Sequence, residues 1–327
     1  MKRRWLLGRA ALLWLAVSLT LYLNAQEQGQ LSAHDLVDSS NSASDLAKLG
    51  PYRLQAIIAV LGQHEATGTF TLEHQADNWR QELQFVDYHE ISVARGESYA
   101  TWRRPDVVLT LPESLAELSQ PWQITLPTGV QPGSVEHSHV QGSPALCFKV
   151  RPAKEFETRY CFDPATHLLM SSEQTSTWSK KETVFLDYQN VDGASFPSEV
   201  RFLQPGTVEM DERKITVTKM PLDAATFTPP AGAREFRTCR NAVPPHLVHR
   251  VEPEYPQMAR IAHIMGDVRM LATIGKDGRV HDIHAVTGHP ILVSSALDAV
   301  KQWVYTPETC PAGPVAMETT IRISFRM

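Results

Sequence analysis

The feature that most constrains the fold is a long succession of β-type segments between residues 52 and 220. In GTFTLEHQ, at residues 68–75, Phe70 and Leu72 alternate with polar side chains at the period of two that marks a half-buried strand. About eleven such segments follow one another with short polar breaks. Such a succession predicts an antiparallel sheet, which curls because strands twist and edges need cover. We therefore expect a curved antiparallel β domain over residues 45–220.

Three other stretches do not follow this strand pattern. PESLAELS, at residues 112–119, lacks alternation and begins with Pro112, which suits a first helical position, so a short helix is predicted there. Residues 26–44 are polar, with clustered serines, and indicate a flexible leader. Residues 221–244 are rich in proline and indicate a stiff linker to a second unit.

The first 25 residues pair a basic start with an apolar run. Lys2, Arg3 and Arg4 precede a nearly continuous apolar stretch over residues 10–23. That stretch is short for the roughly 20 residues that span a bilayer, so an export signal fits it better than a membrane helix. Two interpretations follow: a cleaved signal that delivers the protein to the periplasm, or a retained inner-membrane anchor facing the periplasm.

Composition argues against several function classes. The formal charge is −5 and no basic stripe is present, so nucleic acid is not an expected partner. The chain has no GxSxG, no HExxH and no Gly-rich phosphate loop, so we expect neither an enzyme nor a cofactor. His137 and His139 share a strand face without a third ligand, and His281 and His284 point to opposite faces, so no metal site is expected.

Four cysteines in an exported chain predict disulfides. Their spacing is not CxxC, which argues against zinc and thioredoxin-like chemistry. Cys147 and Cys161 lie on two segments that can form one hairpin, which would set them opposite each other. The remaining pair is then Cys239 with Cys310, joining the linker to the segment after the last predicted helix.

Residues 245–327 follow a different pattern. The stretch VEPEYPQMAR, at residues 251–260, stiffens the chain, because each proline fixes its own φ and biases the residue before it toward extended structure. A hairpin with Asp277-Gly278 at its turn follows. A helix and a one-sided final strand complete the unit. The apolar positions that define these elements are Val268, Met270, Ala272 and Ile274, then Leu292, Ala296, Val300 and Trp303, then Ile321, Ile323 and Phe325.

Four motifs in this unit, EPEYPQMAR, GDVRM…IGKDGRV, ALDAVKQWVYTP and TTIRISFRM, resemble the C-terminal domain of TonB-family proteins in order and spacing. The resemblance implies a periplasmic domain of short helix, hairpin, helix and final strand. It also implies binding of a segment of an outer-membrane TonB-dependent transporter, or another envelope protein, by addition of a strand to the sheet edge. The expected partner-binding residues are Pro253, Tyr255, Pro256, Thr320, Arg322, Ser324 and Arg326.

Some of these residues also have simpler, structural interpretations. Tyr255 also suits the role of a cap on the small core, and Arg322 and Arg326 that of a solvated strand face. The sequence further departs from the energy-transducing members of the family, because residues 1–25 contain no histidine and a β domain replaces the long Pro-rich spacer. These departures put proton-driven energy transduction in doubt.

The β domain resembles the lipoprotein-carrier (LolA-like) family in CFDPATHLLM, LDYQNVDGASFPSEV and PLDAATFTPPAGA. That resemblance implies an unclosed barrel that holds acyl chains under a helical lid. It supplies a second function hypothesis, a periplasmic carrier of a lipid or another hydrophobic ligand. In this second hypothesis the β domain carries the ligand and the C-terminal unit is the part through which the carrier docks.

Overall fold

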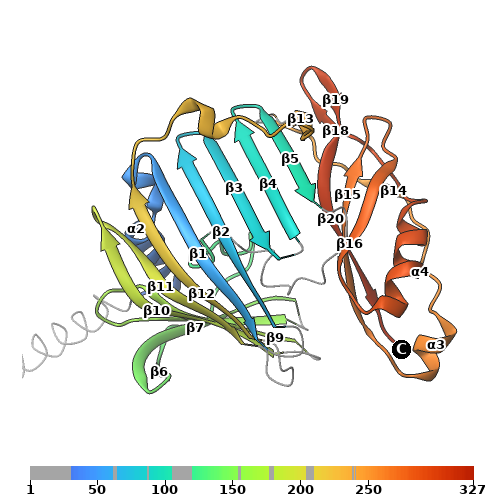
Figure 1. The fold of residues 1–327 in the computed structure, drawn as a ribbon. Coiled ribbons are helices and arrows are strands. Elements are labelled where there is room, and N and C mark those ends of the chain that lie inside the picture. Colours follow the sequence, from blue (N-terminus) through green and yellow to red (C-terminus); the bar gives the residue numbers. More distant parts are fainter. Residues whose placement is uncertain are drawn as a thin grey trace, which may run out of the picture.

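The computed structural model describes residues 31–61, 65–86, 88–104, 120–153, 156–176, 180–203, 210–237, 239 and 241–327. A large curved sheet forms one part, and a smaller unit of strands and two helices lies beside it (Figure 1). The predicted α+β fold, a curved antiparallel sheet followed by a small C-terminal unit, is confirmed. Residues 1–25 and the helix predicted at residues 112–119 lie outside the described residues.

The large sheet contains thirteen strands in the order β13-β5-β4-β3-β2-β1-β12-β11-β10-β9-β8-β7-β6. Every neighbouring pair is antiparallel, and the two outermost strands do not pair with each other, so the sheet is unclosed, as predicted. The sequence missed β6 and β13. The strands are β1 Tyr52–Leu61, β2 Ala66–Gln75, β3 Asn78–Phe85, β4 Tyr88–Arg95, β5 Ser98–Arg104, β6 Glu136–Val140, β7 Ser143–Ala153, β8 Phe156–Phe162, β9 Leu169–Ser176, β10 Lys180–Val191, β11 Ala194–Leu203, β12 Met210–Lys219 and β13 Arg234–Arg237.

The leader predicted as flexible is instead a helix over most of its length. Helix α2, Ala33–Ala43, begins with a capping box in which Ser32 and Asp35 bond each other's backbone amides. Its buried residues, Ala33, Leu36, Val37 and Ser40, recur at the helical period, which the serine-rich composition obscured. These side chains pack on the apolar face of the sheet, so the helix closes part of the main core (Figure 1).

The proline-rich linker is likewise packed rather than free. The short 3-10 helix η3, Ala224–Phe227, buries Phe227 against Ile91 and Val93 on the outer face of β4. Strand β13 then pairs with β5 and extends the sheet by one strand. Prolines stiffen this stretch, as expected, but its hydrogen bonds and its phenylalanine attach it to the β domain.

The C-terminal unit is built on a three-stranded sheet in the order β16-β15-β20. Helix α4 packs on one face of this sheet and buries Leu292, Ala296 and Val300 among the inward side chains of β15 and β20. The helix ends at Val300, so Trp303 reaches the same core from the turn beyond it. The elements are β14 Leu247–His249, α3 Gln257–Ile261, β15 Gly266–Ile274, β16 Val280–Thr287, α4 Pro290–Val300, β17 Val304–Tyr305, β18 Glu308–Cys310, β19 Gly313–Val315 and β20 Met317–Phe325.

The hairpin turn between β15 and β16 requires glycine. Gly278 has a φ of +75°, and a β-carbon there would lie 1.9 Å from the Tyr305 carbonyl oxygen. The approach is close because the Tyr305 amide donates to the Gly278 carbonyl over 2.8 Å. The predicted Asp277-Gly278 turn is thus confirmed, and it joins the hairpin to β17.

Both predicted disulfides are confirmed. Cys147 and Cys161 face each other across β7 and β8, as the hairpin argument required. Cys239 follows β13 and bonds Cys310 at the end of β18. The second disulfide therefore links the end of the large sheet covalently to the C-terminal unit.

We expect Leu36→Ala to lower the free energy of unfolding of the β domain by about 3 kcal/mol, because a fully buried leucine is replaced by a cavity. Urea unfolding followed by tryptophan fluorescence measures this change. The matched control is Asp38→Ala on the exposed face of α2, which we expect to change stability by less than about 0.5 kcal/mol. Equal effects of the two substitutions would contradict the packing of α2 on the sheet.

Candidate functional site

The candidate site is the outer edge of β20. This strand pairs with β15 along its whole length, from Gly266 opposite Phe325 to Ile274 opposite Met317. Among the described strands it has no partner on its other side, so a row of backbone N–H and C=O groups faces away from the sheet. An extended peptide can satisfy such groups by adding a strand.

Side chains of β20 alternate between two environments. Ile321, Ile323 and Phe325 are buried in the core with α4, which confirms the expected inward face. Thr320, Arg322 and Ser324 are exposed on the opposite face. The four predicted site residues on and after β20 therefore lie together on one face, with Arg326 just past the end of the strand.

An aspartate that the sequence analysis did not single out organises this face. Both Arg322 and Arg326 form ion pairs with the Asp267 carboxylate of β15, the second over 2.8 Å. Burial alone would raise the pKa of Asp267, but hydrogen bonds from Ser324 and Arg322 and the two positive charges hold it below its ordinary value. Two guanidinium groups thus share one carboxylate, whose negative charge offsets part of the positive charge of Arg322 and Arg326.

Of the predicted residues Pro253, Tyr255 and Pro256, Tyr255 contacts β20 from the core side through Phe325. The Tyr255 hydroxyl donates to the Ile264 carbonyl oxygen over 2.7 Å, and its ring stands edge-on to Phe325 with centroids 5.5 Å apart. Pro256 is the N-cap residue of α3. Tyr255 is only partly exposed, so the structure favours its interpretation as a cap that joins α3 to the end of β20.

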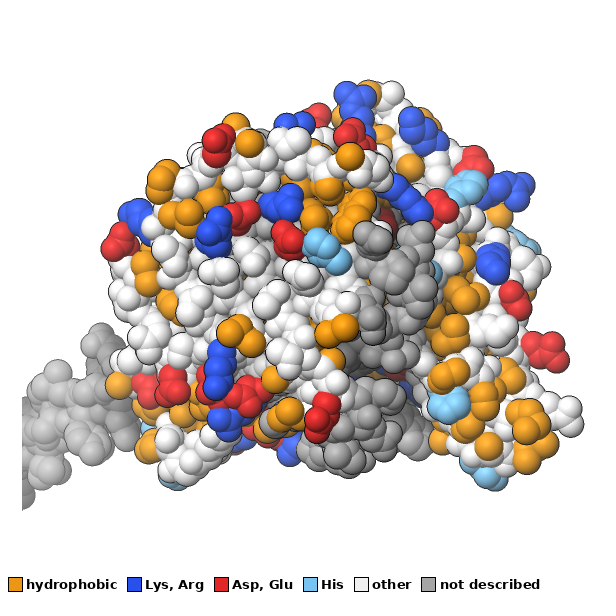
Figure 2. All heavy atoms as spheres, in the orientation of Figure 1, with side chains coloured by type: hydrophobic (Ala, Val, Ile, Leu, Met, Phe, Trp, Pro, Cys, Tyr) orange, Lys and Arg blue, Asp and Glu red, His pale blue; other side chains and the backbone are white. Residues whose placement is uncertain are grey.

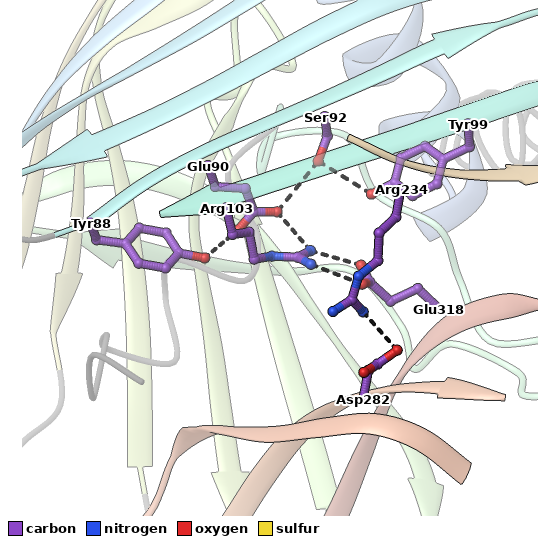
Figure 3. A network of polar contacts seen from close by, with 8 residues as sticks. All are labelled: Tyr88, Glu90, Ser92, Tyr99, Arg103, Arg234, Asp282 and Glu318. Atoms are coloured by element: carbon purple, nitrogen blue, oxygen red, sulfur yellow. Dashed lines mark hydrogen bonds and ion pairs between the residues drawn. The ribbon is translucent and has the colours of Figure 1, made fainter. Parts of the chain in front are cut away.

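The two domains meet at the other end of β20, at a polar junction (Figure 3). Arg103 of β5 donates two hydrogen bonds to Glu318, of 2.8 and 2.7 Å, and a third to its cross-strand neighbour Glu90, of 3.0 Å. Tyr88 donates to the other oxygen of Glu90. Only 11% of the Arg103 side chain and 8% of the Glu318 side chain are exposed, so this pair is buried.

Charge and protonation are fixed at this junction. Burial alone would lower the pKa of Arg103, but Glu318 and Glu90 outweigh it and raise the pKa above its ordinary value. Burial, followed by the charge of Glu90, raises the pKa of Tyr88, so its phenol keeps the proton that it donates. Arg103 therefore stays positively charged and Tyr88 neutral at neutral pH.

The polar junction is one of several non-covalent contacts between the domains. Lys181 of β10 lies near the β15–β20 face, since burial and then the charges of Arg269 and Arg322 lower its pKa. Arg234 of β13 adds an ion pair to Asp282 of β16 at 3.2 Å (Figure 3). In the described part of the chain, no buried apolar cluster takes side chains from both domains. A cavity of about 630 Å³ opens beside the Cys239–Cys310 disulfide, between β13 and the β18–β19 hairpin. The domains are therefore joined by charge and a covalent bond rather than by a shared core.

Hydrogen bonding at the junction is incomplete. Arg103 Nε, Thr101 Oγ1 and Thr273 Oγ1 are buried without a hydrogen-bond partner among the described residues. Thr273 lies directly opposite Glu318, and Thr101 lies two residues before Arg103 on the same strand face. Each unpaired buried group costs about 1–3 kcal/mol, so these groups offset part of the stabilisation by the ion pair.

Among the described residues, no group of three or more His, Cys, Asp or Glu side chains is placed to hold a metal ion. None of the helices in this part of the chain is long and apolar enough to cross a membrane.

Comparison with known proteins identifies the C-terminal unit. Residues 251–327 match the family model of the Gram-negative bacterial TonB protein C-terminal domain. A region of 85 residues is 32% identical to protein TonB of Klebsiella aerogenes and covers 25% of this chain and 33% of that protein. The chain thus spans about a third of the length of this relative. The predicted TonB-type domain at the C-terminal end of the chain is confirmed.

Two solved structures are similar to part of this chain. A LolA superfamily protein from Nitrosomonas europaea is 10% identical with a TM-score of 0.41, over 61% of this chain and 98% of that one. A DUF1329 family protein from Desulfovibrio piger is 9% identical with a TM-score of 0.43, over 60% and 97% of the two chains.

We expect Arg103→Met to lower the free energy of unfolding by about 3–5 kcal/mol, because it leaves the buried Glu318 and the half-buried Glu90 without their cation. The control is Arg322→Met, whose side chain is 48% exposed and whose partner Asp267 keeps Arg326. That change should cost at most about 1 kcal/mol. Urea unfolding of both variants checks the difference, and equal losses would contradict a buried junction.

Asp267 makes the β15–β20 pair sensitive to acid. Its pKa lies below the ordinary value of 3.8, so its ion pairs stabilise the fold above that pH and are lost as the pH falls through the lowered pKa. We expect wild type to be more stable than Asp267→Asn between pH 5 and pH 7, with the difference shrinking below about pH 4. Thermal unfolding at a series of pH values measures it. A constant difference down to pH 2 would contradict the role of the charge.

Proposed function

We propose that this protein is a cell-envelope adaptor that contacts a partner by strand addition to β20. The observation that carries the proposal is the open edge of β20 in a TonB C-terminal domain. From Thr320 onward its outward side chains are exposed, while its first residues approach the β domain at Glu318. The partner is an outer-membrane TonB-dependent transporter segment or another envelope protein.

Binding would combine two contributions. Backbone hydrogen bonds along β20 supply affinity, and side chains at alternate positions supply selectivity. The carboxylate of Asp267 already satisfies part of the charge on Arg322 and Arg326. A partner segment with one acidic side chain would share these arginines with Asp267, so the preference for acidic partners is modest and depends on salt.

The proposed location is the periplasm. Residues 1–25 have the pattern of an export signal, and both cysteine pairs form disulfides, which persist in oxidising compartments. Retention of the same residues as an inner-membrane anchor would leave the C-terminal domain in the same compartment.

A second candidate function is transport of a lipid or another hydrophobic ligand by the β domain. The observation that favours it is the wide apolar face of the unclosed sheet. In the described residues this face is packed by α2 and by Trp122, which is 0% exposed. A ligand would therefore have to displace the helix, and saturable binding of a fluorescent fatty acid distinguishes this function from an adaptor.

Site-specific photo-cross-linking tests the adaptor function in cells that make the protein. Benzoylphenylalanine at Ser324, on the β20 edge, should form an adduct with one envelope protein, mapped to an extended segment of it. The same cross-linker at Asp298, exposed on α4 away from the edge, is the control. If Ser324 gives no adduct beyond the Asp298 level, the proposed strand addition is wrong.

A further inference from the structure

One end of the C-terminal domain carries an exposed apolar surface, which we call the apolar cap. Its members come from α3, the residue before β15, the first turn of α4 and the second residue after β20. Their exposed fractions are 68% for Met258, 66% for Ile261, 49% for Met265, 37% for Ile291 and 58% for Met327. Figure 2 shows hydrophobic side chains gathered at the lower end of this domain, over α3.

The fold brings these residues to the same end. Gly266 pairs with Phe325, so Met265 and Met327 both lie just beyond that end of the β15–β20 ladder. A β-carbon on Gly288 would lie 2.9 Å from Val268 Cγ2, which places the start of α4 beside the start of β15. The cap therefore begins where the open edge of β20 ends.

Tyr255 and its neighbours hold the α3 part of the cap in place. The Tyr255 hydroxyl bonds the Ile264 carbonyl and its ring contacts Phe325, so α3 is fixed to the end of β20. Ser295 of α4 donates to the Glu254 carbonyl, and the Trp303 indole donates to the Val251 carbonyl over 2.8 Å. Met258 and Ile261 therefore lie on a helical turn that is held in place, although most of each side chain is exposed.

Such a surface costs free energy in water. Exposed apolar patches of a few hundred Å² on a soluble domain mark interaction sites, and flexible methionines suit a surface that adapts to its partner. The rim carries both charges, with Arg260 and Glu254 exposed and Arg326 paired to Asp267. A balanced rim gives no preference for an anionic bilayer, so a polypeptide fits this surface better than a lipid surface.

We infer that the apolar cap binds the same partner chain that adds to β20. The partner would carry one or more large apolar side chains just beyond its paired segment, and these would cover Met258 and Ile261. This inference rests on the proposed function and names the partner more closely: an extended segment with an adjacent apolar anchor. Tyr255 then acts as a positioning residue for the cap.

Cross-linking in the full-length protein tests the inference. Benzoylphenylalanine placed at Ile261 and, in a separate variant, at Ser324 should capture the same protein. The two adducts should map to neighbouring stretches of that protein's sequence. Capture of different proteins, or of lipid alone at Ile261, would overturn the inference while the result at Ser324 still decides the proposed function.

A second variant measures the contribution of the cap. Met258→Ser together with Ile261→Ser should reduce the adduct yield at Ser324 by about fivefold or more, because apolar area is no longer buried on binding. The matched control is Val248→Ser, which removes an apolar side chain that is 67% exposed on β14, outside the cap. An unchanged yield in the cap variant, or an equal loss in the control, would overturn the inference. No adduct at Ser324 in the wild-type background would overturn it together with the proposed function.

Discussion

The rest of the structure depends on which strands form the edges of the two main antiparallel sheets. Inner strands of the two main sheets have a neighbour on each side, whereas each outermost strand has one side without a described partner strand. The large sheet ends at β13, a strand of four residues, and at β6, a strand of five. In the small sheet both edges are longer, β16 with eight residues and β20 with nine. Strand β20 pairs with β15 without a register shift, whereas β16 does not, so β20 is the more regular edge for a partner strand.

The junction between the domains follows a different principle from their cores. Each core is apolar, whereas the junction consists of Arg103 with Glu318 and Glu90, the Arg234–Asp282 pair and the Cys239–Cys310 disulfide. Buried ion pairs gain little net free energy once desolvation is counted, but they fix geometry because a displaced partner leaves a bare charge. The junction therefore orients the C-terminal domain, while the disulfide keeps the domains attached.

Strand periodicity allowed most of the fold to be predicted from the sequence. Alternation at positions such as Phe70 and Leu72 depends on local burial, so it identified eleven of the thirteen strands of the large sheet. Helix α2 was missed because the segment is rich in serine and its buried face has only a few large apolar side chains. The helical period was therefore hard to see in the sequence. The roles of Asp267 and Arg103 were missed because cross-strand register and domain contacts decide them, and neither can be read from local pattern. Arg322 and Arg326 were predicted as site residues, but their shared carboxylate was not.

Residue-resolved amide hydrogen exchange of the free, disulfide-intact protein tests the central claim, the open edge of β20, most directly. Between Thr320 and Phe325 we predict an alternating result. Every second amide bonds β15 and exchanges slowly, and the amides between them face outward and exchange at least about a hundredfold faster. The amides of β15 from Arg269 to Ile274, where the strand lies between β16 and β20, should show no such alternation. Uniform slow exchange along β20 would mean that another part of the chain already covers the edge, and it would contradict the account.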